Sequence, residues 1–181
     1  MKQVSVILCS LLLLSACGDS ENQEVTETTS SSTVGIVPAT CELDEVNSAF
    51  ATIIPPSKYI PTQWTPAEGT DLTAALNAGG IACTYGDQDA EVGGTVIWAP
   101  SFAWTEREEI WKSEGMLQVD IPNVDESAAY KLPEGSTSAD GMPAWRVNLL
   151  INGVWIQLGA AFIQSFDEAA PIINAAVQAA K

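Results

Sequence analysis

The segment WRVNLLINGVWIQL, residues 145–158, predicts the centre of the fold. Two β-rich runs flank Asn152-Gly153, the dipeptide that two-residue hairpin turns prefer. Counted outward from this turn, one face carries only apolar pairs: Ile151 with Val154, Leu149 with Ile156, and Val147 with Leu158. The other face is mostly polar: Leu150 with Trp155, Asn148 with Gln157, and Arg146 with Gly159. A slip of one residue would mix the two faces, so the register is well specified, and we expect one face to meet the core and the other to meet solvent.

The segment after the hairpin predicts a C-terminal amphipathic helix. Ser165-Phe166-Asp167-Glu168 is a capping box, in which the serine and the glutamate each accept a backbone N–H at the helix start. Apolar residues then follow at helical spacing and form one stripe: Ala169, Ile172, Ile173, Ala176, Val177 and Ala180. Pro171 comes late for a first turn, so we expect a shifted start or a kink there.

The segments before the hairpin predict short helices and strands. Three of them have a helix start and a helix stop: Thr40 to Pro55-Pro56, Thr70 or Asp71 to Gly79-Gly80, and the capping box at Thr105 to about Glu114. Three others have strand composition, 81–85, 95–98 and 117–121, and a turn-rich loop occupies 87–94. Strands with one polar face and helices with one apolar stripe predict an α+β fold. We expect a two-layer sandwich in which an antiparallel β-sheet packs on helices that include the C-terminal one.

The N-terminus predicts export and lipid attachment. Met1-Lys2 gives a short positive start, and the nearly apolar run 4–14 is too short to span roughly 30 Å of bilayer hydrocarbon. Leu14-Ser15-Ala16-Cys17 resembles the bacterial lipobox, whose cysteine is diacylglycerated and becomes the new N-terminus. The alternatives are an ordinary secretory signal with a chance cysteine and a buried N-terminal helix. Because two or more acyl chains anchor a protein stably, we expect lipid on Cys17 to hold the protein at the extracytoplasmic face of the cell membrane.

This interpretation divides the chain into three parts. Residues 1–16 are the signal peptide, 17–36 hold the lipidated cysteine and a tether rich in Ser, Thr and Glu, and 37–181 form a single domain. The tether has too few apolar side chains to offset the entropy of ordering. We therefore expect it to be flexible, with an average reach of roughly 25 Å.

The charge of the chain argues against two kinds of partner. It has 23 acidic and seven basic residues, and removal of residues 1–16 takes away Lys2 and changes the net charge from −16 to −17. Such a surface repels nucleic acid and anionic lipid head groups. We expect no nucleic-acid partner, and a domain that stands off the bilayer.

Two cysteines remain once Cys9 leaves with the signal and Cys17 carries lipid. In an exported protein the pair of Cys41 and Cys83 predicts one disulfide. Closing the loop between Cys41 and Cys83 should stabilise the fold by about 4 kcal/mol, because the bond lowers the conformational entropy of the unfolded chain. Two free thiols or half of a metal site are the alternatives, although the chain has no histidine to complete a Cys/His site.

The absent residues exclude several chemistries. Without histidine the chain cannot build Ser-His-Asp or Cys-His catalysis, histidine-ligated zinc or an HExxH protease, and it has no GxSxG, P-loop or GxGxxG motif. A carboxylate pair of the glycosidase kind stays open, and its candidates share one predicted helix: Glu106, Glu108, Glu109 and Glu114. A solvated helix face is the simpler interpretation of these acids.

The acidic stretch 87–91 invites a calcium interpretation, with carboxylates at alternate positions. An EF-hand-like loop needs Gly at its sixth position and Glu at its twelfth, where this chain has Val92 and Trp98. We therefore expect an acidic surface loop, and neither a metal nor another cofactor.

Six tryptophans suggest either a filled core or a binding surface. Trp145 lies on the apolar face of the hairpin, which predicts a core position. Trp155 lies on the other face, and four residues there form our candidate binding patch: Arg146, Leu150, Trp155 and Gln157. The alternative is that a helix or strand covers this face.

The lipobox, the Ser/Thr-rich tether, Cys41 at the first helix and Ile81-Ala82-Cys83-Thr84-Tyr85 together resemble a broad group of small actinobacterial cell-envelope lipoproteins of unknown function. The resemblance implies a two-layer α/β sandwich and supplies no catalytic residues. We therefore expect a non-enzymatic lipoprotein that binds an envelope protein or a small-molecule ligand. A carboxylate-dependent hydrolase acting on cell-wall glycans and a structural surface antigen are the alternatives.

Overall fold

The computed structural model of the chain describes residues 34–138 and 140–181. The predicted signal peptide, Cys17 and most of the predicted tether lie outside these residues.

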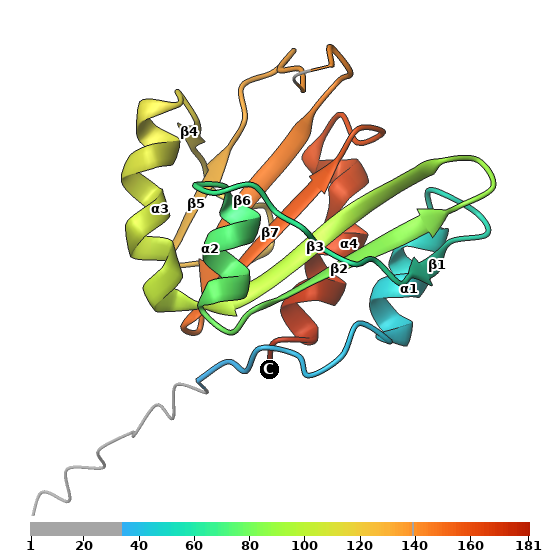
Figure 1. Ribbon diagram of the computed structural model, residues 1–181, viewed down its shortest axis with the longest axis horizontal. Coiled ribbons are helices and arrows are strands. Elements are labelled where there is room, and N and C mark those ends of the chain that lie inside the picture. Colours follow the sequence, from blue (N-terminus) through green and yellow to red (C-terminus); the bar gives the residue numbers. More distant parts are fainter. Residues whose placement is uncertain (1–33, 139) are drawn as a thin grey trace, which may run out of the picture. The chain divides into compact units, whose positions relative to one another are not determined.

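A seven-stranded antiparallel sheet forms the centre of the domain (Figure 1). Its spatial order is β1-β2-β3-β7-β6-β5-β4, and all neighbours pair antiparallel. The strands are β1 (Lys58–Ile60), β2 (Ile81–Asp87), β3 (Val92–Pro100), β4 (Leu117–Gln118), β5 (Ala128–Lys131), β6 (Trp145–Ile151) and β7 (Val154–Ala160). The pairing of β3 with β7 joins the β2–β3 hairpin to the β6–β7 hairpin.

The predicted register of the β6–β7 hairpin is confirmed. Ile151 pairs with Val154 next to the turn, and the other five predicted pairs follow in order outward to Arg146 with Gly159. Asn152 and Gly153 both have positive φ, 50° and 81°, as a type I′ turn requires.

Helices pack on both faces of this sheet. On one face lie α1 (Asp44–Ala51) and α4 (Phe166–Gln178), and on the other lie α2 (Asp71–Asn77) and α3 (Ser101–Ser113) (Figure 1). The α+β class, the antiparallel sheet packed on helices and the C-terminal helix are confirmed. The sheet has helical layers on two sides instead of the single one expected. The prediction that one face of the hairpin meets solvent is therefore wrong, because α2 and α3 cover that face.

Two helix starts follow their predicted caps. Thr70 Oγ1 accepts the N–H of Thr73 at 3.2 Å, and Ser165 Oγ accepts the N–H of Glu168 at 3.2 Å. Glu168 Oε2 in turn accepts the N–H of Gln164 at 2.8 Å. Pro171 lies inside α4, which starts where the capping box predicts.

Other predicted boundaries are wrong, and contacts distant in sequence explain the clearest case. Helix α3 begins at Ser101, directly after β3, because the Ser101 N–H donates to the carbonyl oxygen of Gly153 at 3.0 Å; the Thr105 capping box lies within it. Helix α1 begins at Asp44, and Thr40 lies before it without capping it. The predicted loop 87–94 is a short turn between two longer strands, and the predicted strand 117–121 shrinks to β4.

The predicted disulfide is present. Cys41, just before α1, bonds to Cys83 in β2, and their Cα atoms are 5.4 Å apart. Both cysteines are buried in the core beneath α1 and α4. Tyr85 donates its hydroxyl hydrogen to the carbonyl oxygen of Cys41 at 2.8 Å, and burial raises the pKa of this phenol well above its usual value.

Candidate functional site

The predicted binding patch lies beneath two helices. Arg146, Leu150, Trp155 and Gln157 share one face of β6–β7, as predicted, but α2 and α3 pack over that face. Trp155 and Gln157 are buried, and Arg146 and Leu150 are half-buried. These residues do not form an open binding surface, and the covered arrangement left open as the alternative is the one that the structure has.

Asp71 lies at the centre of this covered face. Its Oδ1 accepts hydrogen bonds from Arg107 Nε at 2.6 Å and Trp111 Nε1 at 2.8 Å. Its Oδ2 accepts one from Gln157 Nε2 at 2.6 Å. Aspartate and arginine are both buried, and a buried charge is stable only with a close partner. The contacts therefore fix α2 and α3 to each other and to β7.

The network around Asp71 continues along the hairpin. Asn148 Oδ1 accepts hydrogen bonds from Gln157 Nε2 at 2.7 Å and Trp155 Nε1 at 3.0 Å. At its edge, Arg146 lies 3.5 Å from Asp71 Oδ2 and 3.5 Å from Glu114 Oε2. We name six residues the Asp71 network: Asp71, Arg107, Trp111, Asn148, Trp155 and Gln157. Their polar groups bond to one another, so this network is a structural joint.

The carboxylates proposed for a glycosidase pair do not have the properties of one. Glu106 and Glu109 are exposed, and Glu114 contacts Arg146. Glu108 accepts hydrogen bonds from Tyr130 Oη at 2.8 Å and Trp104 Nε1 at 3.2 Å. The hydrogen bond from Tyr130 is the main reason that the pKa of Glu108 lies below its usual range. A general acid requires a raised pKa, so Glu108 is held in the opposite state.

The acidic stretch 87–91 forms and stabilises the β2–β3 turn. Asp87 Oδ1 accepts the backbone N–H groups of Asp89 and Ala90 at 2.9 and 3.4 Å. Within residues 34–138 and 140–181, no group of three or more His, Cys, Asp or Glu side chains could hold a metal ion.

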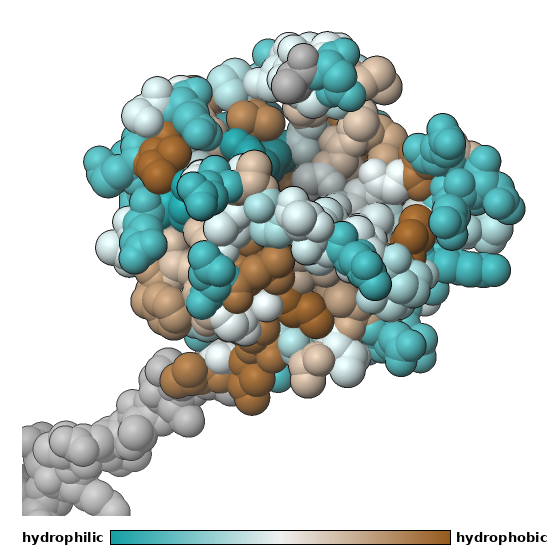
Figure 2. Space-filling view, viewed as in Figure 1, coloured by the Kyte–Doolittle hydropathy of each residue, from teal (hydrophilic) through white to brown (hydrophobic). Residues whose placement is uncertain are grey.

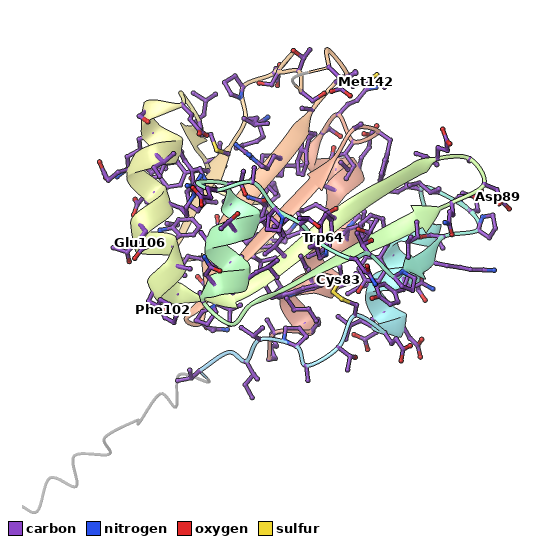
Figure 3. The ribbon with its side chains drawn as sticks, in the orientation of Figure 1. Trp64, Cys83, Asp89, Phe102, Glu106 and Met142 are labelled. Carbon is purple, nitrogen blue, oxygen red and sulfur yellow. A yellow bond between two sulfur atoms is a disulfide. The ribbon has the colours of Figure 1, made fainter. Side chains whose placement is uncertain are left out.

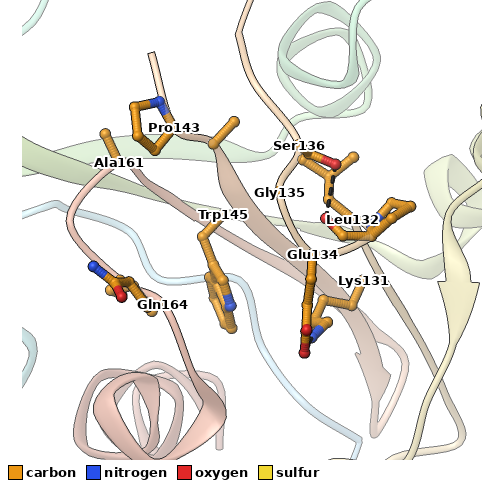
Figure 4. Close-up of a pocket in the computed structure, with 12 residues that line it drawn as sticks. Lys131, Leu132, Glu134, Gly135, Ser136, Pro143, Trp145, Ala161 and Gln164 are labelled. Atoms are coloured by element: carbon orange, nitrogen blue, oxygen red, sulfur yellow. Dashed lines mark hydrogen bonds and ion pairs between the residues drawn. The ribbon is translucent and has the colours of Figure 1, made fainter.

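A cavity opens at the start of β6 (Figure 4). Its volume is about 380 Å³, which falls within the range of pockets that hold small molecules. It is lined by the end of β5 and the segment after it, by the start of β6 and the residues that lead into it, and by residues that follow β7: Lys131, Leu132, Pro133, Glu134, Gly135, Ser136, Pro143, Ala144, Trp145, Ala161, Ile163 and Gln164. We name it the Trp145 cavity.

Trp145 differs from the other five tryptophans. Its ring is 7% exposed and packs edge-on against Phe166 at 5.7 Å, which confirms the predicted core position. Its Nε1 is buried, and no acceptor among the described residues bonds to it. Each of the other five indole N–H groups donates to an oxygen: Trp64 to Ala82, Trp98 to Ala176, Trp104 to Glu108, Trp111 to Asp71 and Trp155 to Asn148. A buried donor without a partner costs about 1–3 kcal/mol, so the Trp145 N–H would gain from a ligand acceptor that displaces the atoms covering it.

Polar side chains lie on both sides of this ring. In Figure 4 the Trp145 indole stands between Gln164 and the pair formed by Lys131 and Glu134. Lys131 Nζ is 3.9 Å from Glu134 Oε1 and 5.3 Å from the centre of the Phe166 ring. The positive charge of Lys131 and the negative charge of Glu134 compensate each other, so the cavity has no strong preference for an anion or a cation.

Sequence reasoning placed Trp145 correctly and missed the cavity. The cavity depends on where segments 132–136 and 161–164 settle after they leave the sheet, and no periodic pattern encodes that. Pro133-Glu134-Gly135 and Pro143 are turn signals that mark irregular chain beside Trp145, and they were the available hint.

No protein family, curated protein or solved structure matches the chain. None of the helices in the described part of the chain combines the length and apolar character needed to cross a membrane.

Proposed function

We propose that this chain is a membrane-anchored extracytoplasmic lipoprotein whose domain binds a small molecule in the Trp145 cavity and does not catalyse a reaction. The anchor would be lipid on Cys17, supported by Leu14-Ser15-Ala16-Cys17 after a short apolar run. The disulfide between Cys41 and Cys83 supports export, because such bonds persist in oxidising compartments outside the cytoplasm.

The single observation that carries the binding proposal is the unpartnered, buried indole N–H of Trp145, a residue that lines the cavity. A ligand would place an acceptor oxygen at this N–H after the side chains that cover it move aside. Its apolar part would contact the apolar lining, which includes Leu132, Pro143 and Ile163. The balanced charges of Lys131 and Glu134 favour a neutral or zwitterionic molecule.

Binding without catalysis is supported by the acids of the cavity. Glu134 is the one carboxylate among the lining residues, its side chain is 91% exposed, and Lys131 lies beside it. A glycosidase needs two carboxyl groups roughly 5–10 Å apart on either side of the bond to be cleaved. The lining residues offer no second carboxyl group.

Calorimetric titration with small neutral or zwitterionic probes tests the cavity. N-acetylglucosamine, N-acetylalanine methylamide and alanylalanine each carry an acceptor oxygen beside an apolar group. We expect at least one to bind, and Trp145→Phe to weaken it by about tenfold, because the variant keeps an aromatic ring but has no N–H to donate. The proposal would be contradicted if none of the three probes bound detectably, or if the variant bound them as tightly as the native protein.

Mass spectrometry of the membrane fraction tests the anchor separately. We expect an N-terminal peptide that begins at Cys17 and carries acyl chains, and a Cys17→Ser variant that is lost from the membrane fraction. A native protein that starts at Met1 without lipid would contradict the anchor and leave the cavity proposal standing.

A further inference from the structure

One end of the sheet has few acidic side chains around it. There β2 and β7 begin, at Ile81 and Val154, and β3 and β6 end, at Pro100 and Ile151. We name the segments at this end the acid-free pole: 34–41, 76–82, 99–105, 151–154 and 174–181. They hold none of the 23 acidic residues of the chain, and Lys181 is their one charged side chain. On the flank, Asp125 shares a shallow pocket with Asn152 and Lys181.

Acidic residues gather at the opposite end of the sheet. Asp87, Asp89 and Glu91 lie in the β2–β3 turn, and Glu134 and Asp140 lie in the segment that leads into β6. Six residue steps along β6 separate the two ends, or about 20 Å at the rise of a β-strand. Charge effects decay over about 10 Å at 0.1 M salt, so the pole lies largely outside the field of the acidic end.

Large apolar side chains are exposed at the acid-free pole. Val34, Ile36 and Phe102 are 76%, 66% and 63% exposed. Figure 2 shows hydrophobic residues gathered on this part of the surface, beside the start of the described chain. Apolar side chains grouped on a protein surface usually mark a contact with a membrane or a protein.

Backbone hydrogen bonds hold these side chains at one place. The Gly35 N–H donates to the carbonyl oxygen of Asn152 at 2.7 Å, and the Ser101 N–H donates to that of Gly153 at 3.0 Å. The segment with Val34 and Ile36 and the helix start with Phe102 therefore flank the same turn. A Cβ atom at position 35 would lie 2.7 Å from the Ala180 oxygen, so this close approach requires glycine.

We propose that the acid-free pole rests on the lipid surface of the membrane, with Val34, Ile36 and Phe102 in the interface. The inference rests on the proposed lipid anchor. The chain from Cys17 enters the domain at this pole, and the 16 residues between Cys17 and Val34 reach at most about 56 Å when fully extended. This end has the apolar side chains that an interface accepts, and its five segments hold none of the carboxylates that anionic lipids repel, although Glu42, Glu106 and Asp125 lie beside them. In this orientation only the acidic end is held away from the bilayer by its charge. The Trp145 cavity then points away from the bilayer.

Site-specific fluorescence on the anchored protein tests this orientation. Phe102→Cys and the matched control Met142→Cys are labelled with an environment-sensitive fluorophore, in full-chain protein reconstituted into phosphatidylcholine vesicles that contain spin-labelled lipid. Both native side chains are exposed, and Figure 3 places them at opposite ends of the domain. We expect a blue shift and loss of most of the fluorescence at position 102, and neither at position 142. Ile36→Cys, labelled in the same way, should behave like position 102.

Flotation of the same vesicles separates the two proposals. If the protein floats with the vesicles and positions 36 and 102 are quenched no more than position 142, the pole proposal is overturned and the anchor stands. If the protein does not float, the anchor is wrong and the orientation falls with it. Quenching confined to vesicles with anionic lipid would overturn the apolar contact in favour of charge attraction at Lys181.

Discussion

The two faces of the β6–β7 hairpin are both buried, but by different physics. On one face, Leu149 and Ile156 pack with α1 and α4 in an apolar core of aliphatic and aromatic side chains, where volume decides which substitutions are tolerated. On the other face, Asn148 and Gln157 are buried because the Asp71 network supplies partners for them. The comparison teaches that a polar strand face is not a solvent face when distant helices bring matching donors and acceptors. It also makes the unpartnered N–H of Trp145 an exception among the six indole groups.

The polar face should be the more fragile when one charge is removed. Asp71→Leu leaves the buried Arg107 guanidinium without its carboxylate, and we expect the free energy of unfolding to fall by about 3–5 kcal/mol. Urea denaturation measures the loss. The exposed Glu106→Leu on the same layer should change stability by no more than about 0.5 kcal/mol.

A double variant sharpens this prediction. Asp71→Leu combined with Arg107→Met removes both charges and should recover much of the loss, because no charge is then buried alone. A single Asp71→Leu variant as stable as the native protein would mean that the network is not a structural joint.

The apolar face should respond to lost volume. Leu149 is fully buried in the apolar core, and Leu149→Ala should lower the free energy of unfolding by about 3 kcal/mol through lost burial and a residual cavity. The half-exposed Leu117 gives a control, since Leu117→Ala removes the same atoms from a site open to solvent. Equal losses in the two variants would contradict the assignment of the core to this face.

Two tryptophans provide a matched pair across the sheet. Trp155 donates to Asn148 Oδ1, and this oxygen also accepts a hydrogen bond from Gln157. Trp98 donates to the carbonyl oxygen of Ala176. The Ala180 N–H, four residues later in the helix, donates to Val177 and not to Ala176. We expect Trp98→Phe to lower the free energy of unfolding by about 2 kcal/mol and Trp155→Phe by about 1 kcal/mol, because only the first variant leaves a buried acceptor without a donor. Thermal unfolding of both variants measures the difference, and the reverse order would contradict this explanation.

The smallest expected effect concerns pH on the polar face. Tyr130 holds the pKa of Glu108 below its usual range, so the ionised Glu108 stabilises the fold above the unfolded-state value of about 4.3. That contribution is lost as the pH falls through the lower folded-state pKa. Tyr130→Phe should raise the pKa of Glu108 toward its usual value in an NMR titration of the carboxyl carbon. An unchanged pKa would mean that Trp104 and Lys112, which is 3.1 Å from Glu108, lower it without Tyr130.

Local signals predicted much of this fold. The hairpin register follows from Asn152-Gly153 and the alternation beside it, and the starts of α2 and α4 follow from Thr70 and Ser165. These features depend on residues within a few positions of one another. The disulfide was also predictable, because two cysteines remained for one bond in a chain expected to be exported.

Contacts between distant segments account for what could not be predicted. Helix α3 starts at Ser101 because of a hydrogen bond to Gly153, and a local capping box at Thr105 could not reveal that. The burial of Gln157 depends on Asp71, which lies 86 positions earlier in the chain. The Trp145 cavity depends on irregular segments on either side of the hairpin, whose paths no periodicity encodes.

The most direct test of the account is the spectrum of the six indole N–H groups in ¹⁵N–¹H NMR, assigned by single Trp→Phe variants. Titration with N-acetylglucosamine, N-acetylalanine methylamide and alanylalanine should move the Trp145 signal downfield and leave those of Trp111 and Trp155 in place, since only Trp145 has a donor to offer. A fixed Trp145 signal with all three probes, or shifts at Trp111 and Trp155 instead, would contradict the claim that this cavity is the binding site and the Asp71 network a structural joint.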